Sequence, residues 1–191
     1  MDAELVRDVL IDGFERVRED LHAVLAGASP ATVLHRPAAG ANSIGWLAWH
    51  LTRIQDDHLA GLAAVLGGEE PPSDWGHERR GQLWLDAGWR ERFALPYPDE
   101  DTGYGHGADD VARFGVGDPA LLDGYHAAVH ERTLEVLRSL DADGYRTVVD
   151  LRFGPPVTAA VRLVSVLNDT AQHVGQAAYV KGLGLDRLDL L

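Results

Sequence analysis

An acidic and an imidazole side chain stand at helical spacing near the carboxyl end of the chain. Asp169 and His173 are four residues apart, and Gln176 follows three residues after the histidine. Residues three or four apart lie on the same face of an α-helix, so these side chains would line one edge. A carboxylate and an imidazole placed in this way could bind one metal ion. They could equally form a buried hydrogen-bonded pair without chemistry, because a buried carboxylate needs a partner or a cation.

The helix that carries this pair is predicted to run from about residue 157 to 181, with Gly182 and Gly184 as its end signal. Apolar residues occur nearly all round it, which is typical of a largely buried helix. They are Val161, Leu163, Val164, Val166, Leu167, Ala171, Val174, Ala177, Ala178 and Val180. Polar residues in the middle of such a helix favour a functional site over an accident of sequence.

Three further long helices are predicted from apolar residues that recur every three or four positions. They span about residues 4–25, 44–66 and 118–140. Asn42 or Ser43 offers a cap for the second helix, and Asp118 followed by Pro119 is a strong start signal for the third. Four long helices predict an all-α fold, with an antiparallel four-helix bundle as the simplest architecture.

The segment between the second and third helices, residues 69–117, is a long irregular excursion. It is rich in proline and glycine, yet its many aromatic residues indicate that it folds over the bundle, with one short helix near 79–93. The glycine-rich run 101–107 lacks the features of a phosphate-binding loop and would suit a lid from which Tyr104 or His106 could reach a ligand. A short strand is predicted at 148–153.

Composition limits the class of function. The 191 residues suffice for a single domain (1–191), and no apolar run is long enough to span a bilayer. The net charge of −13 disfavours binding to nucleic-acid phosphates. The chain has no cysteine, so it has neither a disulfide nor a thiolate of its own. Its acidic N-terminal sequence does not resemble a signal peptide, and we expect a cytoplasmic protein.

Two motifs resemble those of the DinB/YfiT superfamily. Residues 42–51, Asn-Ser-Ile-Gly-Trp-Leu-Ala-Trp-His-Leu, are similar to the second-helix signature, which ends on a metal-binding histidine, here His50. Residues 169–176, Asp-Thr-Ala-Gln-His-Val-Gly-Gln, are similar to the fourth-helix motif His-x-x-x-His-x-Gly-Gln. The spacing of the motifs and the order of the helices also fit, so the resemblance covers essentially the whole chain.

The resemblance implies a four-helix bundle, often a homodimer, in which three side chains hold a divalent metal. By position, His50 and His173 match ligands of the family. Asp169 takes the third position, where the family's usual residue is histidine. Two histidines and a carboxylate still form a competent site with open positions. Zinc is the expected metal, with nickel, iron or manganese as alternatives, because a carboxylate suits harder ions than an imidazole does.

Other polar residues have simpler interpretations. His126 and His130 form a second pair at helical spacing, for which solvated or edge positions are favoured, although one of them could be a fourth ligand or an acid–base group. Asp57 shares a helix face with His50, but seven residues of helix separate them by roughly 10 Å. Asp57 could therefore pair with Arg53 or orient a ligand, and a solvated position is favoured over both.

The resemblance also implies an activity, because several members of the family transfer a low-molecular-weight thiol, such as bacillithiol or mycothiol, to or from small molecules. The leading hypothesis is a metal-dependent transferase that uses a mycothiol-like thiol on a small-molecule substrate, with the metal lowering the pKa of the thiol. The alternatives are a hydrolase that uses metal-activated water and a non-catalytic bundle that binds a small ligand or a metal. Acyl-enzyme chemistry has no support, since the chain lacks both Gly-x-Ser-x-Gly and cysteine.

Overall fold

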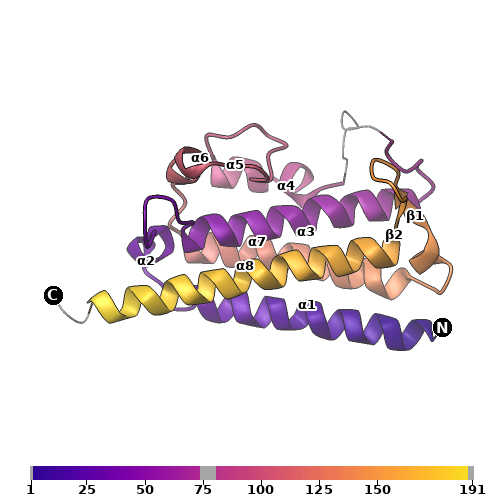
Figure 1. Cartoon of the computed structure of the whole chain (residues 1–191), viewed down its shortest axis with the longest axis horizontal. Helices are drawn as coiled ribbons and strands as arrows, with labels where there is room; N and C mark the ends of the chain where they lie inside the picture. Colours follow the sequence, from indigo (N-terminus) through magenta and orange to yellow (C-terminus); the bar gives the residue numbers. More distant parts are fainter. Residues whose placement is uncertain (1, 74–80, 189–191) are drawn as a thin grey trace.

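Four long helices form the body of the structure, a computed structural model that describes residues 2–73 and 81–188, with side chains as far as residue 183. They are α1 (Ala3–Leu25), α3 (Ile44–Leu66), α7 (Pro119–Ser139) and α8 (Ala159–Leu188). Helices α1 and α3 each pack against both α7 and α8 (Figure 1). The predicted all-α class is confirmed. Within the described part of the chain, no helix combines the length and the apolar character needed to cross a membrane.

The starts of α3 and α7 follow from capping residues. Ser43 Oγ accepts a hydrogen bond from the Trp46 N–H at 3.1 Å, and Asp118 Oδ1 accepts one from the Ala120 N–H at 2.9 Å. Each cap satisfies a backbone donor that has no partner inside the helix, and Pro119 has the fixed φ that suits a first helical residue. Both predicted starts are confirmed.

Neighbouring helices do not all run antiparallel. Thr52 contacts His126, and Gln55 contacts Thr133, so α3 and α7 run in the same direction. Helices α1 and α8 are also parallel, whereas the pairs α3–α8 and α1–α7 are antiparallel (Figure 1). Short loops force antiparallel neighbours, but a long connection can return the chain to the end where it started. Residues 67–118 make such a return, which explains the difference from the predicted antiparallel bundle.

Shorter elements lie between the long helices. The helical ones are α2 (Pro30–Leu34), α4 (Leu83–Asp86), α5 (Trp89–Phe93), α6 (Ala108–Ala112) and the 3-10 helix η1 (Gly144–Arg146). Strands β1 (Val148–Asp150) and β2 (Val157–Thr158) form an antiparallel pair, with Val148 opposite Thr158 and Asp150 opposite Val157. The single short helix expected near 79–93 is two helices, α4 and α5, because Gly88 adopts φ +71 between them. Part of that expected range, 79–80, lies outside the described residues, and the strand expected at 148–153 is confined to β1.

Helix α8 differs from its prediction in burial and in length. Its buried side chains form one stripe: Ala159, Leu163, Val166, Thr170, Val174, Ala177 and Val180. Val161 and Val164 are 57% and 59% exposed, because the helix packs on α1 and α3 with one side only. Gly182 and Gly184 lie inside the helix, which continues to Leu188. Glycine lowers helix propensity by only about 1 kcal/mol, which does not by itself end a helix.

A polar layer crosses the bundle and divides its core into two hydrophobic clusters. One cluster includes Leu21, Leu51, Val129 and Val174, and the other includes Phe14, Leu62, Leu137 and Leu163. Between them along α3, α7 and α8 lie four buried residues, Gln55, His130, Thr133 and Thr170, which we call the polar layer. Within it, Gln55 Nε2 donates to Thr133 Oγ1 at 2.7 Å.

The excursion is anchored on α3 by buried acidic side chains. Asp56 Oδ1 accepts a hydrogen bond from the Leu83 N–H at 2.9 Å, and its Oδ2 accepts one from the Trp84 N–H at 2.7 Å. The Gln82 amide donates to Asp57 at 3.0 Å. The solvated position expected for Asp57 is wrong, because the excursion folds onto this polar side of α3 and covers it.

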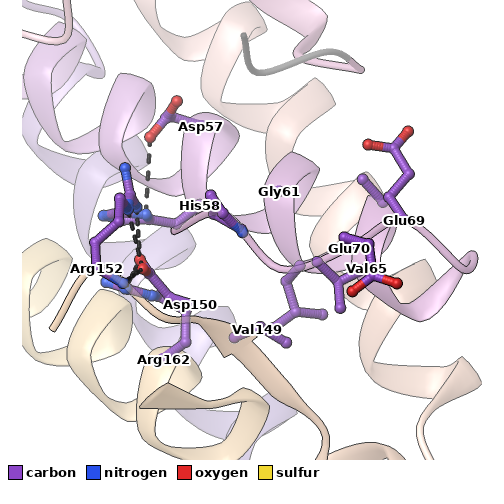
Figure 2. Close-up of a pocket in the computed structure, with 13 residues that line it drawn as sticks. Asp57, His58, Gly61, Val65, Glu69, Glu70, Val149, Asp150, Arg152 and Arg162 are labelled. Atoms are coloured by element: carbon purple, nitrogen blue, oxygen red, sulfur yellow. Dashed lines mark hydrogen bonds and ion pairs between the residues drawn. The ribbon is translucent and has the colours of Figure 1, made fainter. Parts of the chain in front are cut away.

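Ion pairs join the β1–β2 hairpin to α8 (Figure 2). Asp150 accepts hydrogen bonds from Arg152 at 2.5 Å and from Arg162 at 2.7 Å, and the side chains of Arg152, Arg162 and Asp150 are only 6%, 11% and 3% exposed. A cavity of about 40 Å³ beside them is also lined by His58 and Glu69. Burial, together with the two guanidinium charges, lowers the pKa of His58 to about 3, so this histidine is neutral.

Candidate metal centre

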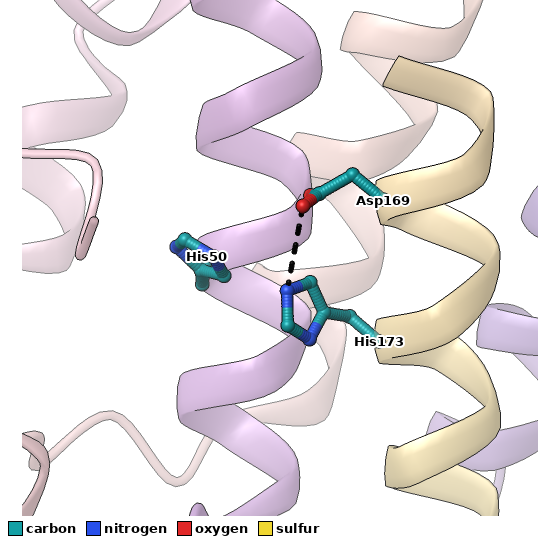
Figure 3. Close-up of side chains that lie close together, drawn as sticks. All are labelled: His50, Asp169 and His173. Carbon is teal, nitrogen blue, oxygen red and sulfur yellow. Dashed lines mark ion pairs between the residues drawn. The ribbon is translucent and has the colours of Figure 1, made fainter. Parts of the chain in front are cut away.

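The three predicted ligands converge between α3 and α8 (Figure 3). His50 lies on the second turn of α3, and Asp169 and His173 lie on successive turns in the middle of α8. Each offers one ligand atom, and these atoms lie within 4.8 Å of one another. No other group of three or more His, Cys, Asp or Glu side chains among the described residues meets this criterion. Atoms this close can share one ion, since metal–nitrogen and metal–oxygen bonds are about 2.0–2.2 Å long.

His50 is buried, and its ring is held in one tautomer. Its Nδ1 lies 2.6 Å from the Thr102 carbonyl oxygen. A carbonyl only accepts hydrogen bonds, so Nδ1 carries the proton and Nε2 carries the free lone pair. The Trp46 ring stacks on the imidazole with 4.7 Å between centroids. Burial lowers the pKa of His50 by more than the Thr102 hydrogen bond raises it, which favours the neutral form that a metal ligand needs.

His173 is held in the same way from within α8. Its Nδ1 lies 3.1 Å from Gln176 Oε1, so it donates to an amide oxygen one turn further along the helix. Nε2 is again the nitrogen with the free lone pair. Metal-binding histidines commonly have the second ring nitrogen hydrogen-bonded to an oxygen acceptor, which fixes the ring orientation. Gln176, which the sequence placed on the same edge as Asp169 and His173, thus orients a candidate ligand.

The simpler alternative, a hydrogen-bonded Asp–His pair, does not fit the geometry. Asp169 Oδ1 lies 3.7 Å from His173 Nε2, which is beyond hydrogen-bond distance. Asp169 Oδ2 is buried and has no hydrogen-bond partner among the described residues. A buried carboxylate oxygen without a donor is unfavourable, and a cation would supply the missing partner. The carboxylate therefore fits a metal ligand better than it fits a satisfied pair.

His106 takes a supporting position instead of offering a free ligand atom. Its Nδ1 accepts a hydrogen bond from Trp46 Nε1 at 3.3 Å, and its Nε2 lies 2.8 Å from Asp101 Oδ2. Both ring nitrogens are thus engaged. Tyr104 is 88% exposed. Sequence reasoning missed the contact between Thr102 and His50, because a backbone acceptor has no signature in residue types; the glycine-rich run 101–107 was the only signal.

The second histidine pair lies away from the candidate centre. His126 and His130 are both buried, so the expected solvated or edge positions are wrong. The reason is that α7 packs against both α1 and α3, which cover this face. His126 Nδ1 lies 3.3 Å from Thr52 Oγ1, and burial lowers the pKa of His126 to about 3. Neither histidine belongs to the group of converging ligand atoms.

Comparison with known proteins identifies the family of this fold and site. A model of the DinB superfamily matches residues 13–177. The chain belongs to the DinB superfamily. Among solved structures, the crystal structure of a conserved protein of locus from Enterococcus faecalis is 30% identical, with a TM-score of 0.78, over 94% of this chain and 97% of that chain. No curated protein matches the chain.

Membership of the DinB superfamily confirms the resemblance seen at residues 42–51 and 169–176. All three converging side chains lie within the matched residues 13–177. The description of the Enterococcus faecalis protein names no activity, so it supports the fold and the family and says nothing of a substrate.

Proposed function

We propose that this DinB-superfamily protein is an enzyme that depends on a divalent metal held by His50, Asp169 and His173. The proposal rests on the state of the three ligand groups. Both imidazoles have Nδ1 engaged by an amide oxygen, and one carboxylate oxygen is buried without a donor among the described residues. Two imidazoles that each have Nε2 free, together with a carboxylate, suit a divalent transition metal. We propose zinc first, with nickel, iron or manganese as alternatives.

The chain's own residues shape what such a centre can do. A bound metal would lower the pKa of a thiol or a water beside it. Because the chain has no cysteine, a thiol nucleophile has to come from a second small molecule. Asp169 and His173 keep side-chain exposures of 38% and 19%, which leaves the α8 side of the site accessible to small molecules. We therefore propose a mycothiol-like thiol as the co-substrate in a transfer to a small molecule.

Metal content is the first test. Protein purified without a histidine tag and loaded with zinc should hold about one ion per chain by mass spectrometry of the metal, with binding confirmed by calorimetry. His173→Ala should abolish binding with little change in helical content, because the residue is partly exposed at the edge of the core. Gln172→Ala, an exposed neighbour on the same helix, should bind like the wild type. A wild-type protein that binds no divalent metal would overturn the proposal.

Thiol consumption is the second test. The metal-loaded protein, given a low-molecular-weight thiol and a panel of electrophilic small molecules, should consume the thiol, and His173→Ala should not. Release of hydrolysis products without thiol loss would replace the transferase with a hydrolase. Metal binding without either reaction would leave a binding protein. The predicted homodimer stays a prediction that light scattering can test.

A further inference from the structure

A turn from the excursion lies directly against the candidate metal centre. Residues 101–103, which we call the 101–103 turn, contact α3 at His50 and Arg53. The Thr102 carbonyl is the acceptor 2.6 Å from His50 Nδ1. The chain therefore places an orienting group for an α3 ligand in a segment far from both α3 and α8 in sequence.

Hydrogen bonds from α3 and within the turn itself hold the 101–103 turn in place. Arg53, which is fully buried one turn after His50, donates through Nε to the Asp101 carbonyl at 3.2 Å. The Asp101 side chain accepts a hydrogen bond from the Gly103 N–H at 2.7 Å, which closes the turn on itself. The two carbonyls of adjacent residues 101 and 102 are thus both bonded to α3 side chains, so the turn has little freedom to move relative to the helix.

Gly103 is the residue that allows this close approach. Its φ is +84°, a conformation that glycine adopts without strain. A Cβ at this position would lie 2.9 Å from Trp49 Cζ3, 3.0 Å from His50 Nδ1 and 3.0 Å from Trp46 Cζ2. All three atoms belong to rings packed in the interior, which cannot swing away as the end of a flexible side chain can. An added methyl group would therefore push the turn away from His50.

We propose that Gly103 is a positioning residue for the metal centre: it lets the Thr102 carbonyl reach His50 and fix the tautomer whose Nε2 is free for a metal. The part of this inference that concerns metal affinity rests on the proposed function. The part that concerns the tautomer is a property of the metal-free protein. Substituting an oxygen acceptor behind a metal-bound histidine commonly weakens metal binding about 10- to 100-fold.

Gly105 provides a matched control for a substitution at Gly103. Its φ is +82°, so alanine introduces the same backbone strain there, but nothing lies within 4 Å of the added Cβ. We expect Gly103→Ala to lose the single Nδ1–H tautomer of His50, measured by nitrogen-15 NMR of the imidazoles without metal. We also expect it to weaken zinc affinity about 10- to 100-fold by calorimetry. Gly105→Ala should keep both the tautomer and the affinity of the wild type.

The outcomes separate this inference from the proposed function. If the wild type binds no metal, the proposed function fails, while the tautomer comparison still tests the role of Gly103. If the wild type binds zinc and Gly103→Ala keeps both tautomer and affinity, the inference is wrong. If Gly103→Ala does not fold, Asp101→Ala replaces it, since it opens the same turn without adding atoms. An unchanged His50 tautomer in Asp101→Ala would then overturn the inference.

Discussion

Asp169 stands where the motif that this chain resembles has a histidine, and its surroundings fit the proposed role of a carboxylate ligand. Its Oδ1 lies near His173 Nε2, and its Oδ2 is buried without a donor among the described residues. One oxygen of this partly exposed side chain is therefore left for a cation, whereas a structural carboxylate would accept hydrogen bonds there. Replacing Asp169 with histidine or with leucine distinguishes a ligand from a residue that merely neighbours the site.

Asp169→His should still bind metal, with its preference shifted toward zinc, because imidazole suits zinc and carboxylate suits harder ions. Asp169→Leu should lose the metal, while its free energy of unfolding should be unchanged or higher by up to about 1 kcal/mol, since a carboxylate oxygen that is buried without a donor is removed. Competitive titration with zinc and manganese measures the preference, and urea denaturation measures the stability. Asn168→Leu, exposed on the same helix, is the control for added apolar surface. Retention of metal by Asp169→Leu would show that the carboxylate is not a ligand.

At the scale of elements, buried charges attach the irregular parts of the chain to the bundle. The excursion is held by Asp56 and Arg53 of α3, and the β1–β2 hairpin is held by Asp150, which joins Arg152 to Arg162 of α8. Burial opposes ionisation of Asp150, but the Arg152 hydrogen bonds and the two guanidinium charges outweigh it and hold the pKa of this carboxyl below its usual range. The hairpin therefore depends on an ionised carboxylate.

Asp150→Asn should lower the free energy of unfolding by about 3 kcal/mol at neutral pH, because two largely buried guanidinium groups lose their counter-charge. A lowered pKa in the folded state stabilises the wild type above the unfolded-state pKa of about 3.9, and this contribution is lost as the pH falls through the folded-state pKa. The difference between variant and wild type should therefore shrink below about pH 4. Urea denaturation across this pH range measures both effects.

Asp143→Asn is the matched control for this prediction. Asp143 also pairs with an arginine, Arg146, at 3.3 Å, but its side chain is 96% exposed. Its loss should change the free energy of unfolding by less than about 0.5 kcal/mol at any pH. Equal effects at the two positions, or a pH-independent effect at Asp150, would contradict the role given to the hairpin network.

At the scale of the whole molecule, the polar layer separates two hydrophobic clusters, and it is not fully satisfied. Gln55 Oε1 and His130 Nδ1 are buried without a hydrogen-bond partner among the described residues. The Thr133 hydroxyl, by contrast, donates to the Val129 carbonyl at 2.8 Å. It would therefore keep a partner if the Gln55 amide were removed. The layer lowers the stability that a continuous apolar core of this length would have.

Gln55→Leu should raise the free energy of unfolding by about 1 kcal/mol, because it replaces an unpaired buried acceptor with apolar volume of similar size. Leu51→Ala, one turn earlier in the apolar cluster, should lower it by about 2–5 kcal/mol through the cavity that it creates. Thermal and urea denaturation measure both variants against the wild type. A loss of more than about 1 kcal/mol in Gln55→Leu would show that Oε1 has a hydrogen-bond partner, such as an internal water.

Local signals predicted the long helices and two of the three candidate ligands. The caps Ser43 and Asp118 mark helix starts, because the groups that they satisfy lie within three residues of them. Spacing along one helix placed Asp169, His173 and Gln176 together, since helical geometry repeats every turn. The family motifs then added His50 as the residue that meets them from a second helix.

Tertiary packing decided what local signals could not. The solvent-facing valines of α8, the buried histidines of α7 and the burial of Asp57 depend on which surfaces other helices and the excursion cover. The contact between the Thr102 carbonyl and His50 forms only because the chain returns over α3 about fifty residues later. Every residue has a backbone carbonyl, so no residue type in the sequence marks this one as the acceptor. Sequence by itself therefore determined the long helices and the pairing of Asp169 with His173, because these follow from short-range periodicity, and the family motif added His50 as the third candidate ligand. Only the folded structure determined their burial, the directions of the helices and the groups that orient the ligands, because these arise from long-range contacts.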